Sequence, residues 1–357
     1  MRFALRALTV GVSTLAVFGF AAGQAAAQKR INWKMQSAFG STVPLVGTSG
    51  LSFAKKIEEM SDGKFKIKFF EPGALVPPFE CFDAVAKGSV DLCWTSQGYY
   101  TGKYAALAFH AAVPFGPGLG EYVAWKRFGN GDKLQNELFG RHGLKFIDAY
   151  CHGPETSGWF RNEIKSTDEL KGLKMRFFGL GAQVMQKFGV STQLLAGGDI
   201  YPALERGVID ATEFSMPVMD IKYGFYQIAK NNYFPGWHQQ TSCGGVLISQ
   251  KLYDSLPNYY KAMIQTAAWG VMLETFAESE AVNPEAMLEM QKKHGVKVHR
   301  WSDADLAKFE QGWLDVIKEQ SAKDADFKKV ADDYLAFREK YRIWGSAQSL
   351  NSTYLKK

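Results

Sequence analysis

Near its start, the chain alternates hydrophobic and polar positions with two different periods. Residues 31–36 and 64–70 alternate at every second position, which is typical of strands. Residues 45–60 lie between them and carry apolar side chains at helical spacing. A second helix is predicted at residues 77–88, because prolines are tolerated in a first turn and a glycine ends the run, and residues 89–94 follow as a short apolar strand. Strands that alternate with helices predict an α/β fold with a mainly parallel sheet.

The same succession of elements returns in the middle of the chain. It predicts three strands and two helices between them, at residues 172–178, 181–189, 190–195, 197–207 and 208–214. Pro202 is expected in the first turn of its helix, where a proline costs least. The middle of the chain therefore predicts a second α/β unit.

The two units share a sequence repeat. The stretch Asp199–Phe214 matches Glu80–Leu92, 119 residues earlier, without a gap. An acid matches an acid and an aromatic residue matches an aromatic residue, and the glycines and the last aspartates also match (Gly88 with Gly207, Asp91 with Asp210). In both places a helix, a glycine and a strand follow one another, so the repeat predicts two lobes of similar design.

The pattern changes after residue 256. Residues 257–282 are predicted as one helix, which Asn283 and Pro284 kink or end. Such a helix spans roughly 39 Å, enough to cross two lobes. Residues 302–322 and 324–344 predict two more amphipathic helices, whose apolar stripes cover either the core of this chain or a partner subunit.

Residues 1–27 have the features of a bacterial secretory signal. They contain Arg2 and Arg6, then an apolar run, then small residues that end at Ala27. A retained membrane anchor is the weaker alternative, because Gly, Ser and Thr interrupt the run. Cleavage after Ala27 leaves an exported, soluble, periplasmic chain of about 330 residues, enough for two domains.

Removing the signal lowers the formal net charge from +6 to +4, because it takes away two arginines and no acids. No dense block of Lys and Arg occurs along the sequence, which excludes nucleic acid as a partner. Four cysteines, Cys81, Cys93, Cys151 and Cys243, are too widely spaced for a disulfide scaffold. They are expected as buried free thiols, although spacing leaves a Cys151–Cys243 bridge open.

The sequence gives no support to catalysis, so the chain is not expected to be an enzyme. Residues 179–184 begin like a dinucleotide-binding loop, but Val184 stands where the third glycine is needed. The six histidines are scattered, and neither a nucleophile elbow nor a phosphate loop occurs. A nicotinamide-dependent enzyme would need catalytic partners that this sequence lacks.

Charged residues at the ends of apolar strands are the better candidates for a site. Arg176 ends a predicted strand, at the edge where open α/β sheets bind ligands. A guanidinium there can hold a carboxylate with two parallel hydrogen bonds. Glu213 occupies the equivalent edge in the repeat, and Glu155 lies in a turn before another strand. The alternative for each is a solvated surface residue.

Over essentially its whole mature length, the chain resembles the extracytoplasmic solute receptors of TRAP transporters. Five segments carry the resemblance, at residues 53–70, 96–116, 170–189, 194–214 and 224–238. Within that family, "AGGDIYPALERGVIDATEF" and "YFPGWH" are similar to the branch that binds 2-oxo and 2-hydroxy acids together with a metal ion.

The resemblance implies a periplasmic binding protein fold, with two α/β lobes joined by a hinge and closing on a ligand. Lobe I is expected at 28–150 with 235–265 returning to it, and lobe II at 151–234 with 266–325 contributing. The long helix would span both lobes. Residues 326–357 form a C-terminal helical segment, which in this branch can dimerise the receptor. Arg176 would grip the ligand carboxylate.

The resemblance also implies a metal site, from which this sequence departs twice. Glu155 replaces a usual Gln, and Phe214 replaces a Trp in a Glu-Trp pair that with the Gln coordinates sodium. The expected metal ligands are Glu155, Glu213, the backbone carbonyl of Phe214, and Gln240. Two carboxylates, the ligand acid and Arg176 sum to a charge of −2, which favours Ca²⁺ over Na⁺. Protonation of Glu155 is the alternative.

Further pocket residues are expected from both lobes. Tyr99 and Tyr100 follow a predicted strand of lobe I, with hydroxyls that can reach a ligand. Trp237 and Gln240 lie where the chain recrosses the hinge. Phe214 in place of Trp leaves room for an acid bulkier than pyruvate. Ser37 and Phe39 are weaker candidates, and packing is the alternative for all of them.

These features together predict a binding protein that captures a small organic acid, a 2-oxo or 2-hydroxy monocarboxylate such as pyruvate or lactate, with a bound metal ion. The TRAP membrane permease subunits are the implied partners, and a homodimer through the C-terminal helix is possible in this branch. A receptor for a bulkier or aromatic carboxylate and a ligand-sensing protein are the alternatives with the same arginine.

Overall fold

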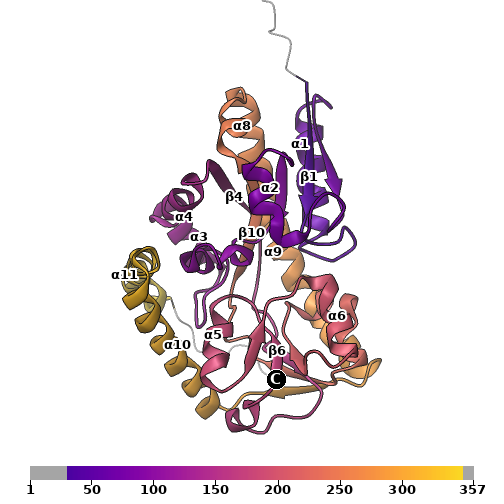
Figure 1. Cartoon of the computed structure of the whole chain (residues 1–357), viewed down its shortest axis with the longest axis vertical. Helices are drawn as coiled ribbons and strands as arrows, with labels where there is room; N and C mark the ends of the chain where they lie inside the picture. The colour runs from indigo at the N-terminus through magenta and orange to yellow at the C-terminus, as the bar shows by residue number, and fades with distance from the viewer. Residues whose placement is uncertain (1–29, 349–357) are drawn as a thin grey trace, which may run out of the picture.

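The computed structural model describes residues 30–348, which form two lobes stacked along the long axis of the molecule (Figure 1). The predicted secretory signal and the last nine residues lie outside this range. Each lobe is built on one mixed sheet with helices packed around it. The predicted α/β fold is therefore confirmed.

Lobe I contains a five-stranded sheet in the order β2-β1-β3-β10-β4. β1 is parallel to β2 and β3, whereas β10 lies antiparallel between β3 and β4. Its strands are β1 (Ile31–Ser37), β2 (Phe65–Phe70), β3 (Leu92–Thr95), β4 (Leu144–His152) and β10 (Ser242–Ser249). Its helices are α1 (Thr48–Met60), η1 (Pro78–Glu80), α2 (Cys81–Ala86), η2 (Gln97–Tyr100), η3 (Ala105–His110), α3 (Leu119–Phe128), α4 (Gly131–Gly140) and α8 (Gln250–Asp254).

Lobe II contains a six-stranded sheet in the order β11-β9-β5-β8-β6-β7. Only β5 is antiparallel to its neighbours. Its strands are β5 (Gly158–Phe160), β6 (Lys174–Arg176), β7 (Ser191–Gln193), β8 (Ala211–Thr212), β9 (Asn231–Phe234) and β11 (Lys297–Arg300). Its helices are η4 (Thr167–Leu170), α5 (Gly179–Lys187), α6 (Gly197–Glu205), α7 (Pro217–Tyr223) and η5 (Phe225–Gln227).

The structure confirms the sequence repeat. In lobe I, α2 is followed by Gly88 and then β3; in lobe II, α6 is followed by Gly207 and then β8. Both glycines have positive φ, +74° and +71°, a backbone conformation that favours glycine. Each repeat thus places a short parallel strand beside the first strand of its own unit, β1 or β6.

Two prolines lie inside helices, where a first-turn position was expected for Pro202 and either a kink or the end of the helix at Pro284. α9 (Asn258–Lys292) runs through Pro284 instead of ending there, and Pro202 lies beyond the first turn of α6. A proline removes one helical hydrogen bond, which tertiary contacts can outweigh. In α9, Asn283 supplies such a contact, because its side chain accepts a bond from Val218 N of α7 at 3.0 Å; within α9 it also donates to Ser279 O at 2.7 Å.

The long helix α9 packs against both lobes, on α1 and β4 in lobe I and on α7 in lobe II. The chain also passes between the lobes from β4 to β5, in extended form, and from β9 to β10, through a turn at residues 237–238. With the passage from α10 to α11 at residue 324, four connections join the lobes within residues 30–348. None of the helices in residues 30–348 is long and apolar enough to cross a membrane.

The two C-terminal helices, α10 (Asp303–Lys323) and α11 (Ala325–Ala347), run along the outside of the molecule (Figure 1). α10 packs on α5 of lobe II, and α11 returns to η3 of lobe I. Phe327 and Tyr334 of α11 are buried against Phe109, with ring centroids 5.0 and 5.4 Å apart. The core of this chain therefore covers the first half of the apolar stripe of α11, whereas Leu335, Ile343 and Trp344 are exposed.

The four cysteines form two disulfides, so the prediction of buried free thiols is wrong. Cys81 at the start of α2 is joined to Cys93 of β3, and Cys151 of β4 is joined to Cys243 of β10. The Cα atoms of each pair are 6.0 and 4.1 Å apart. Sequence spacing could not predict the Cys151–Cys243 bridge, because β10 lies between β3 and β4 in the sheet. This places two cysteines that are 92 positions apart next to each other.

Candidate functional site

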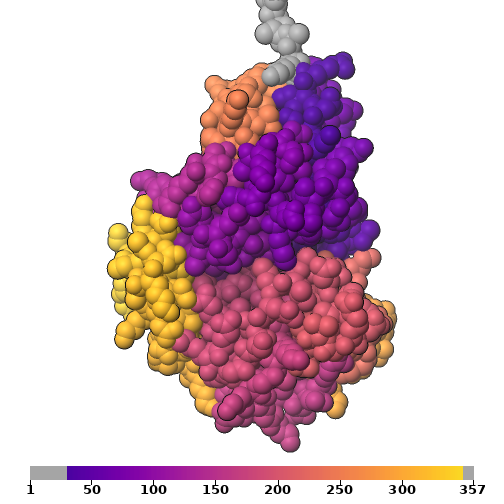
Figure 2. All heavy atoms as spheres, in the orientation of Figure 1, coloured from indigo at the N-terminus to yellow at the C-terminus, as the bar shows by residue number. Residues whose placement is uncertain are grey.

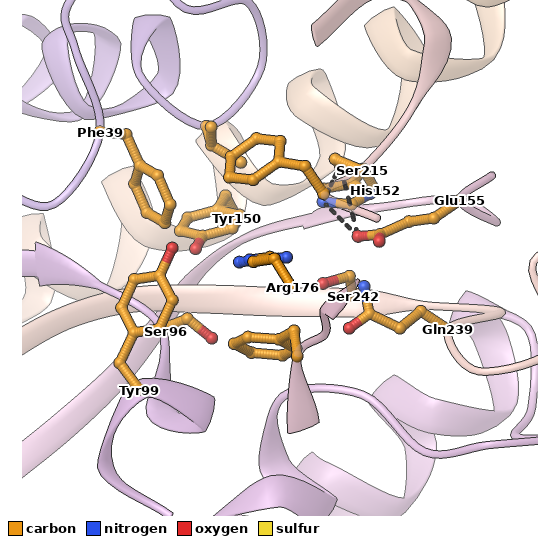
Figure 3. Close-up of a pocket in the computed structure, with 13 residues that line it drawn as sticks. Phe39, Ser96, Tyr99, Tyr150, His152, Glu155, Arg176, Ser215, Gln239 and Ser242 are labelled. Carbon is orange, nitrogen blue, oxygen red and sulfur yellow. Dashed lines mark hydrogen bonds and ion pairs between the residues drawn. The ribbon is translucent and has the colours of Figure 1, made fainter. Parts of the chain in front are cut away.

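A small cavity lies between the two lobes, which meet along a continuous seam on the face shown in Figure 2. Its free volume is about 30 Å³. Its lining residues come from both lobes and from the segments that connect them: Phe39, Val46, Ser96, Tyr99, Tyr150, His152, Glu155, Arg176, Phe178, Phe214, Ser215, Gln239 and Ser242. Figure 3 shows Arg176 in the middle, with aromatic rings at one end and Glu155, His152 and Gln239 at the other.

Arg176 is the last residue of β6, and its side chain is 1% exposed. Its Nη1 donates to Oε1 and to the backbone carbonyl of Glu213, both at 2.8 Å, and its Nε donates to Leu195 O at 3.2 Å. Within residues 30–348, these bonds leave the two N–H groups of Nη2 for a ligand. The guanidinium is thus fixed on one side by its own lobe.

Glu213 follows β8 and is fully buried. Besides Arg176, its Oε1 accepts a hydrogen bond from the backbone N–H of Phe178. Burial alone would raise the pKa of Glu213, but Arg176 and His238 outweigh burial and hold the pKa below its usual value. Glu213 is therefore ionised at neutral pH.

Glu155 lies in the first extended connection between the lobes and is 3% exposed. Its Oε1 accepts a hydrogen bond from Ser215 Oγ at 3.3 Å, and His152 Nε2 lies 3.6 Å from the same oxygen. Burial raises the pKa of Glu155 well above its usual value, and the negative charges of Glu213 and Asp220 add to that shift. The positive charge of Arg176 lowers the pKa of Glu155 but does not offset these effects, so this carboxyl group is only partly compensated.

Several buried polar atoms at this end of the cavity have no hydrogen-bond partner among the described residues, although His238 Nε2 lies 3.6 Å from Glu213 Oε2 and 3.9 Å from Glu155 Oε2. They are Oε2 of Glu155, Oε2 of Glu213, Oε1 of Gln239 and both ring nitrogens of His238. One ligand atom each from Glu155, Glu213 and His238 lie within 4.8 Å of one another. Buried oxygens without partners are rare in folded proteins, and carboxylate and amide oxygens suit Ca²⁺ or Na⁺. The residues present therefore fit a bound cation.

Aromatic side chains form the other end of the cavity. The ring of Tyr99 contacts Phe178 of lobe II and Phe39 of lobe I, with centroids 5.6 and 5.9 Å apart. Phe39 also meets Tyr150 edge to face at 6.0 Å. Burial raises the pKa of Tyr99 to about 12, so its hydroxyl stays protonated and can donate. These rings form an apolar wall at this end of the cavity.

The structure brings together most of the residues that the sequence singles out. Arg176, Glu155, Tyr99, Phe214 and Phe39 line the cavity, with Glu213 beside Arg176. Ser37 lies behind Phe39, where its hydroxyl donates to the carbonyl of Phe39 at 2.7 Å.

Three expected pocket residues lie elsewhere. Tyr100 is buried in lobe I, where its hydroxyl donates to Thr95 Oγ1 at 3.0 Å. Trp237 stacks on Phe309 at 4.6 Å, outside the cavity lining. The amide of Gln240 donates to Gly236 O at 2.9 Å, and the neighbouring Gln239 lines the cavity instead. Gln239 thus stands where Gln240 was expected.

Sequence reasoning missed the polar lining residues Ser96, Tyr150, His152, Ser215 and Ser242. Ser96 and Ser215 are 119 residues apart, so extending the repeat by a few positions would have found this pair. His152 and Ser242 face each other in the register of β4 and β10, which no local pattern reveals.

Comparison with known proteins agrees with this architecture. Residues 39–324 match the family described as bacterial extracellular solute-binding protein, family 7. The chain is 35% identical over 322 residues to a monocarboxylate 2-oxoacid-binding periplasmic protein of Nostoc sp., covering 90% of this chain and 88% of the relative.

Solved structures show the same fold. A TRAP transporter solute-binding protein of Bordetella bronchiseptica, with copurified calcium and picolinate, has a TM-score of 0.87 and 31% identity, over 90% of this chain and 95% of that one. A TRAP periplasmic solute-binding protein of Colwellia psychrerythraea, with bound calcium and pyruvate, has a TM-score of 0.85 and 27% identity, over 90% and 98% of the two chains.

Proposed function

The chain belongs to family 7 of the bacterial extracellular solute-binding proteins, and from this premise we propose that it captures a small 2-oxo or 2-hydroxy monocarboxylate together with a metal ion. Members of this family are periplasmic receptors of TRAP transporters and not enzymes; they deliver small organic acids to membrane permease subunits. The finer assignment of this chain's ligand is a proposal. A secretory signal at residues 1–27 and a periplasmic location are part of it.

One observation carries the proposal: a buried guanidinium with free donors stands beside two buried carboxylates whose outer oxygens are unpartnered. Arg176 can donate to the carboxylate of an acid, since charge-assisted bonds of this kind are about twice as strong as neutral ones. The unpartnered oxygens call for a cation, which can also bind the acid. The 2-oxoacid-binding relative and the pyruvate-bound structure support this substrate class.

The proposed metal ligands are Glu155, Glu213, the backbone carbonyl of Phe214, and Gln239 in place of Gln240. The bound ion would neutralise negative charge and bind an oxygen of the acid. The carboxylates of Glu155, Glu213 and the ligand, together with the guanidinium of Arg176, have a net charge of −2. A divalent ion neutralises this charge, so Ca²⁺ is favoured over Na⁺. Two of the similar proteins hold calcium, while a TRAP solute-binding protein of Pseudoalteromonas atlantica, 28% identical, holds sodium with pyruvate, so the choice of Ca²⁺ rests on the charge sum.

In the proposed binding step, the protein's own residues orient the acid and exclude water. Lobe II supplies Arg176, which is already held in place by Glu213 and Leu195. Lobe I supplies the rings of Tyr99 and Phe39, which cover the organic part of the ligand. Closure of the lobes removes water from these charges and strengthens their interactions.

An aromatic acid is the second candidate. The rings of Phe39, Tyr99, Phe178 and Phe214 border the cavity, and Arg176 lies 5.4 and 6.0 Å from the ring centres of Phe214 and Phe178. The Bordetella bronchiseptica protein, 31% identical, holds picolinate, an aromatic acid whose ring nitrogen is adjacent to the carboxylate. Such an acid offers a metal the same pair of donor positions as a 2-oxo acid.

The test is thermal unfolding of residues 28–357 after chelation and exhaustive dialysis. Pyruvate, larger 2-oxo acids, lactate and picolinate are added in turn, each with sodium or with calcium. A ligand at 100 times its dissociation constant stabilises the folded protein by about 2.7 kcal/mol, which shifts the transition visibly. We expect a shift that needs both an acid and calcium. A shift with acid alone would reject the metal, and no shift with any acid would reject the substrate class.

A further inference from the structure

Lobe I contains a buried cluster of polar and charged side chains that lies outside the cavity. Lys126 of α3 is 3% exposed, and its Nζ lies 2.9 Å from Asp148 Oδ2 and 2.8 Å from Gln135 Oε1. Asp132 and His110 also approach this ammonium, at 3.4 and 3.3 Å. Four elements, α3, α4, β4 and η3, therefore converge on one buried positive charge.

The cluster reaches the cavity through Gln97, which is fully buried. Its Nε2 donates to Gln135 Oε1 at 2.9 Å and to Asp148 Oδ1 at 2.5 Å. Gln97 is the first residue of η2, directly after Ser96. Its side chain points into the cluster, while Ser96 and Tyr99 on either side of it line the cavity.

The same segment carries the contact between the lobes. A Cβ atom added at Gly98 would lie 2.0 Å from Cζ of Phe178 in lobe II, so the backbone of Gly98 rests directly on that ring. Tyr99 packs edge to face against Phe178 at 5.6 Å. Small displacements of residues 96–99 would therefore change both the wall of the cavity and the fit of lobe I on lobe II.

We propose that Gln97 is a positioning residue for ligand binding. Its bond to Asp148, which is itself paired with Lys126, holds residues 96–99 in the position in which they line the cavity and contact lobe II. This inference rests on the proposed function, because it assigns the support of that same site. A buried ion pair adds little net stability when compared with apolar packing. Its use here is geometric, since a charged acceptor fixes the direction of the Gln97 amide.

The test compares Gln97→Met with a matched control, Gln36→Met. Gln36 is also a fully buried glutamine of lobe I. It makes three hydrogen bonds, to Ser37, Glu71 and Leu75, whereas Gln97 makes two, and it does not line the cavity. Calorimetric titration with pyruvate or picolinate in the presence of calcium gives the dissociation constant. We expect Gln97→Met to raise it roughly 10- to 100-fold, the usual effect of lost supporting bonds, and Gln36→Met to leave it within about twofold.

A second readout needs no ligand. Hydrogen exchange of the unliganded protein, followed by mass spectrometry, should show faster exchange of peptides that cover residues 96–100 in Gln97→Met but not in Gln36→Met. Should Gln97→Met not fold, Asp148→Asn keeps the shape of its partner and should show the same local change. Equal exchange and equal dissociation constants in both glutamine variants would overturn the proposal. If the wild type binds neither acid, the proposed function fails while hydrogen exchange still decides the role of Gln97.

Discussion

The two repeats have the same backbone arrangement but differ in buried side chains, first at the position of Gln36 in lobe I and Arg176 in lobe II. In lobe I, Asp91 accepts a hydrogen bond from the backbone N–H of Lys34 at 2.8 Å; in lobe II, Asp210 accepts one from Lys174 at 2.9 Å. The equivalence extends to the strand register. Gln36 pairs with Cys93 in lobe I, and Arg176 pairs with Thr212 in lobe II, again 119 residues on from Cys93. Gln36 is therefore the structural counterpart of Arg176.

Both side chains anchor the loop that follows the neighbouring parallel strand. Gln36 donates to Glu71 O and accepts from Leu75 N, whereas Arg176 donates to Leu195 O. The neutral amide is satisfied by its own lobe, while the guanidinium retains donors that face the cavity. Both residues stabilise a loop at the same strand end. Only the charged one, Arg176, also has donors left for a ligand, which makes it the candidate binding group.

A second difference lies one residue beyond the strand residue that pairs with Gln36 or Arg176. Trp94 in lobe I and Glu213 in lobe II occupy equivalent positions. Trp94 is buried, with its indole N–H donating to Val46 O at 2.7 Å, and Glu213 holds Arg176. Lobe I thus contributes shape to the cavity, and lobe II contributes charge.

The largest effect is expected when lobe II is converted to the pattern of lobe I by Arg176→Gln. Loss of the guanidinium should weaken acid binding roughly 100-fold or more. It should also lower the free energy of unfolding by about 3–5 kcal/mol, because Glu213 remains buried without its cation. Titration calorimetry and thermal unfolding measure the two quantities.

The control for this change is the double variant Arg176→Gln with Glu213→Gln. Removing both charges should restore much of the stability without restoring acid binding. Unchanged acid binding in either variant would show that the carboxylate is held somewhere else.

An intermediate effect is expected from Gly98→Ala, which disturbs the contact of the two lobes. The added Cβ would collide with Phe178 where the lobes meet in this structure, so we expect the lobes to close less well and affinity to fall roughly tenfold or more, while the unliganded protein unfolds at the same temperature. Gly102→Ala is the matched control, because a Cβ there meets nothing within 4 Å. Small-angle scattering with ligand should show a less compact Gly98→Ala; a compact form with normal affinity would contradict the role of this contact.

The smallest effect is expected from the two aspartates that occupy equivalent positions in the repeats, Asp91 and Asp210. Asp91→Ala and Asp210→Ala each remove one hydrogen bond to a backbone N–H at an exposed site. Each should lower the free energy of unfolding by about 1 kcal/mol and leave acid affinity unchanged. Denaturant unfolding of both variants measures this loss. A cost several times larger in one lobe would show that the two repeats differ in more than their cavity residues.

Much of the fold was predictable because local patterns determine it. The helix–glycine–strand repeat and the strand ends that carry Arg176 and Glu213 depend on short-range periodicity. The disulfides, the choice of Gln239 over Gln240, and the continuation of α9 through Pro284 depend on long-range packing. The charged cluster around Lys126 belongs to the same group, because its members come from four separate elements.

The Cys151–Cys243 bridge has a consequence for how the lobes move. It ties β4 to β10 at the points where two of the four connections meet lobe I, since His152 and Ser242 are the next paired residues. Both connecting segments therefore start from one covalently fixed pivot. In the proposed closure of the lobes, lobe II rotates about that pivot, and the bridge keeps the two segments from sliding past each other.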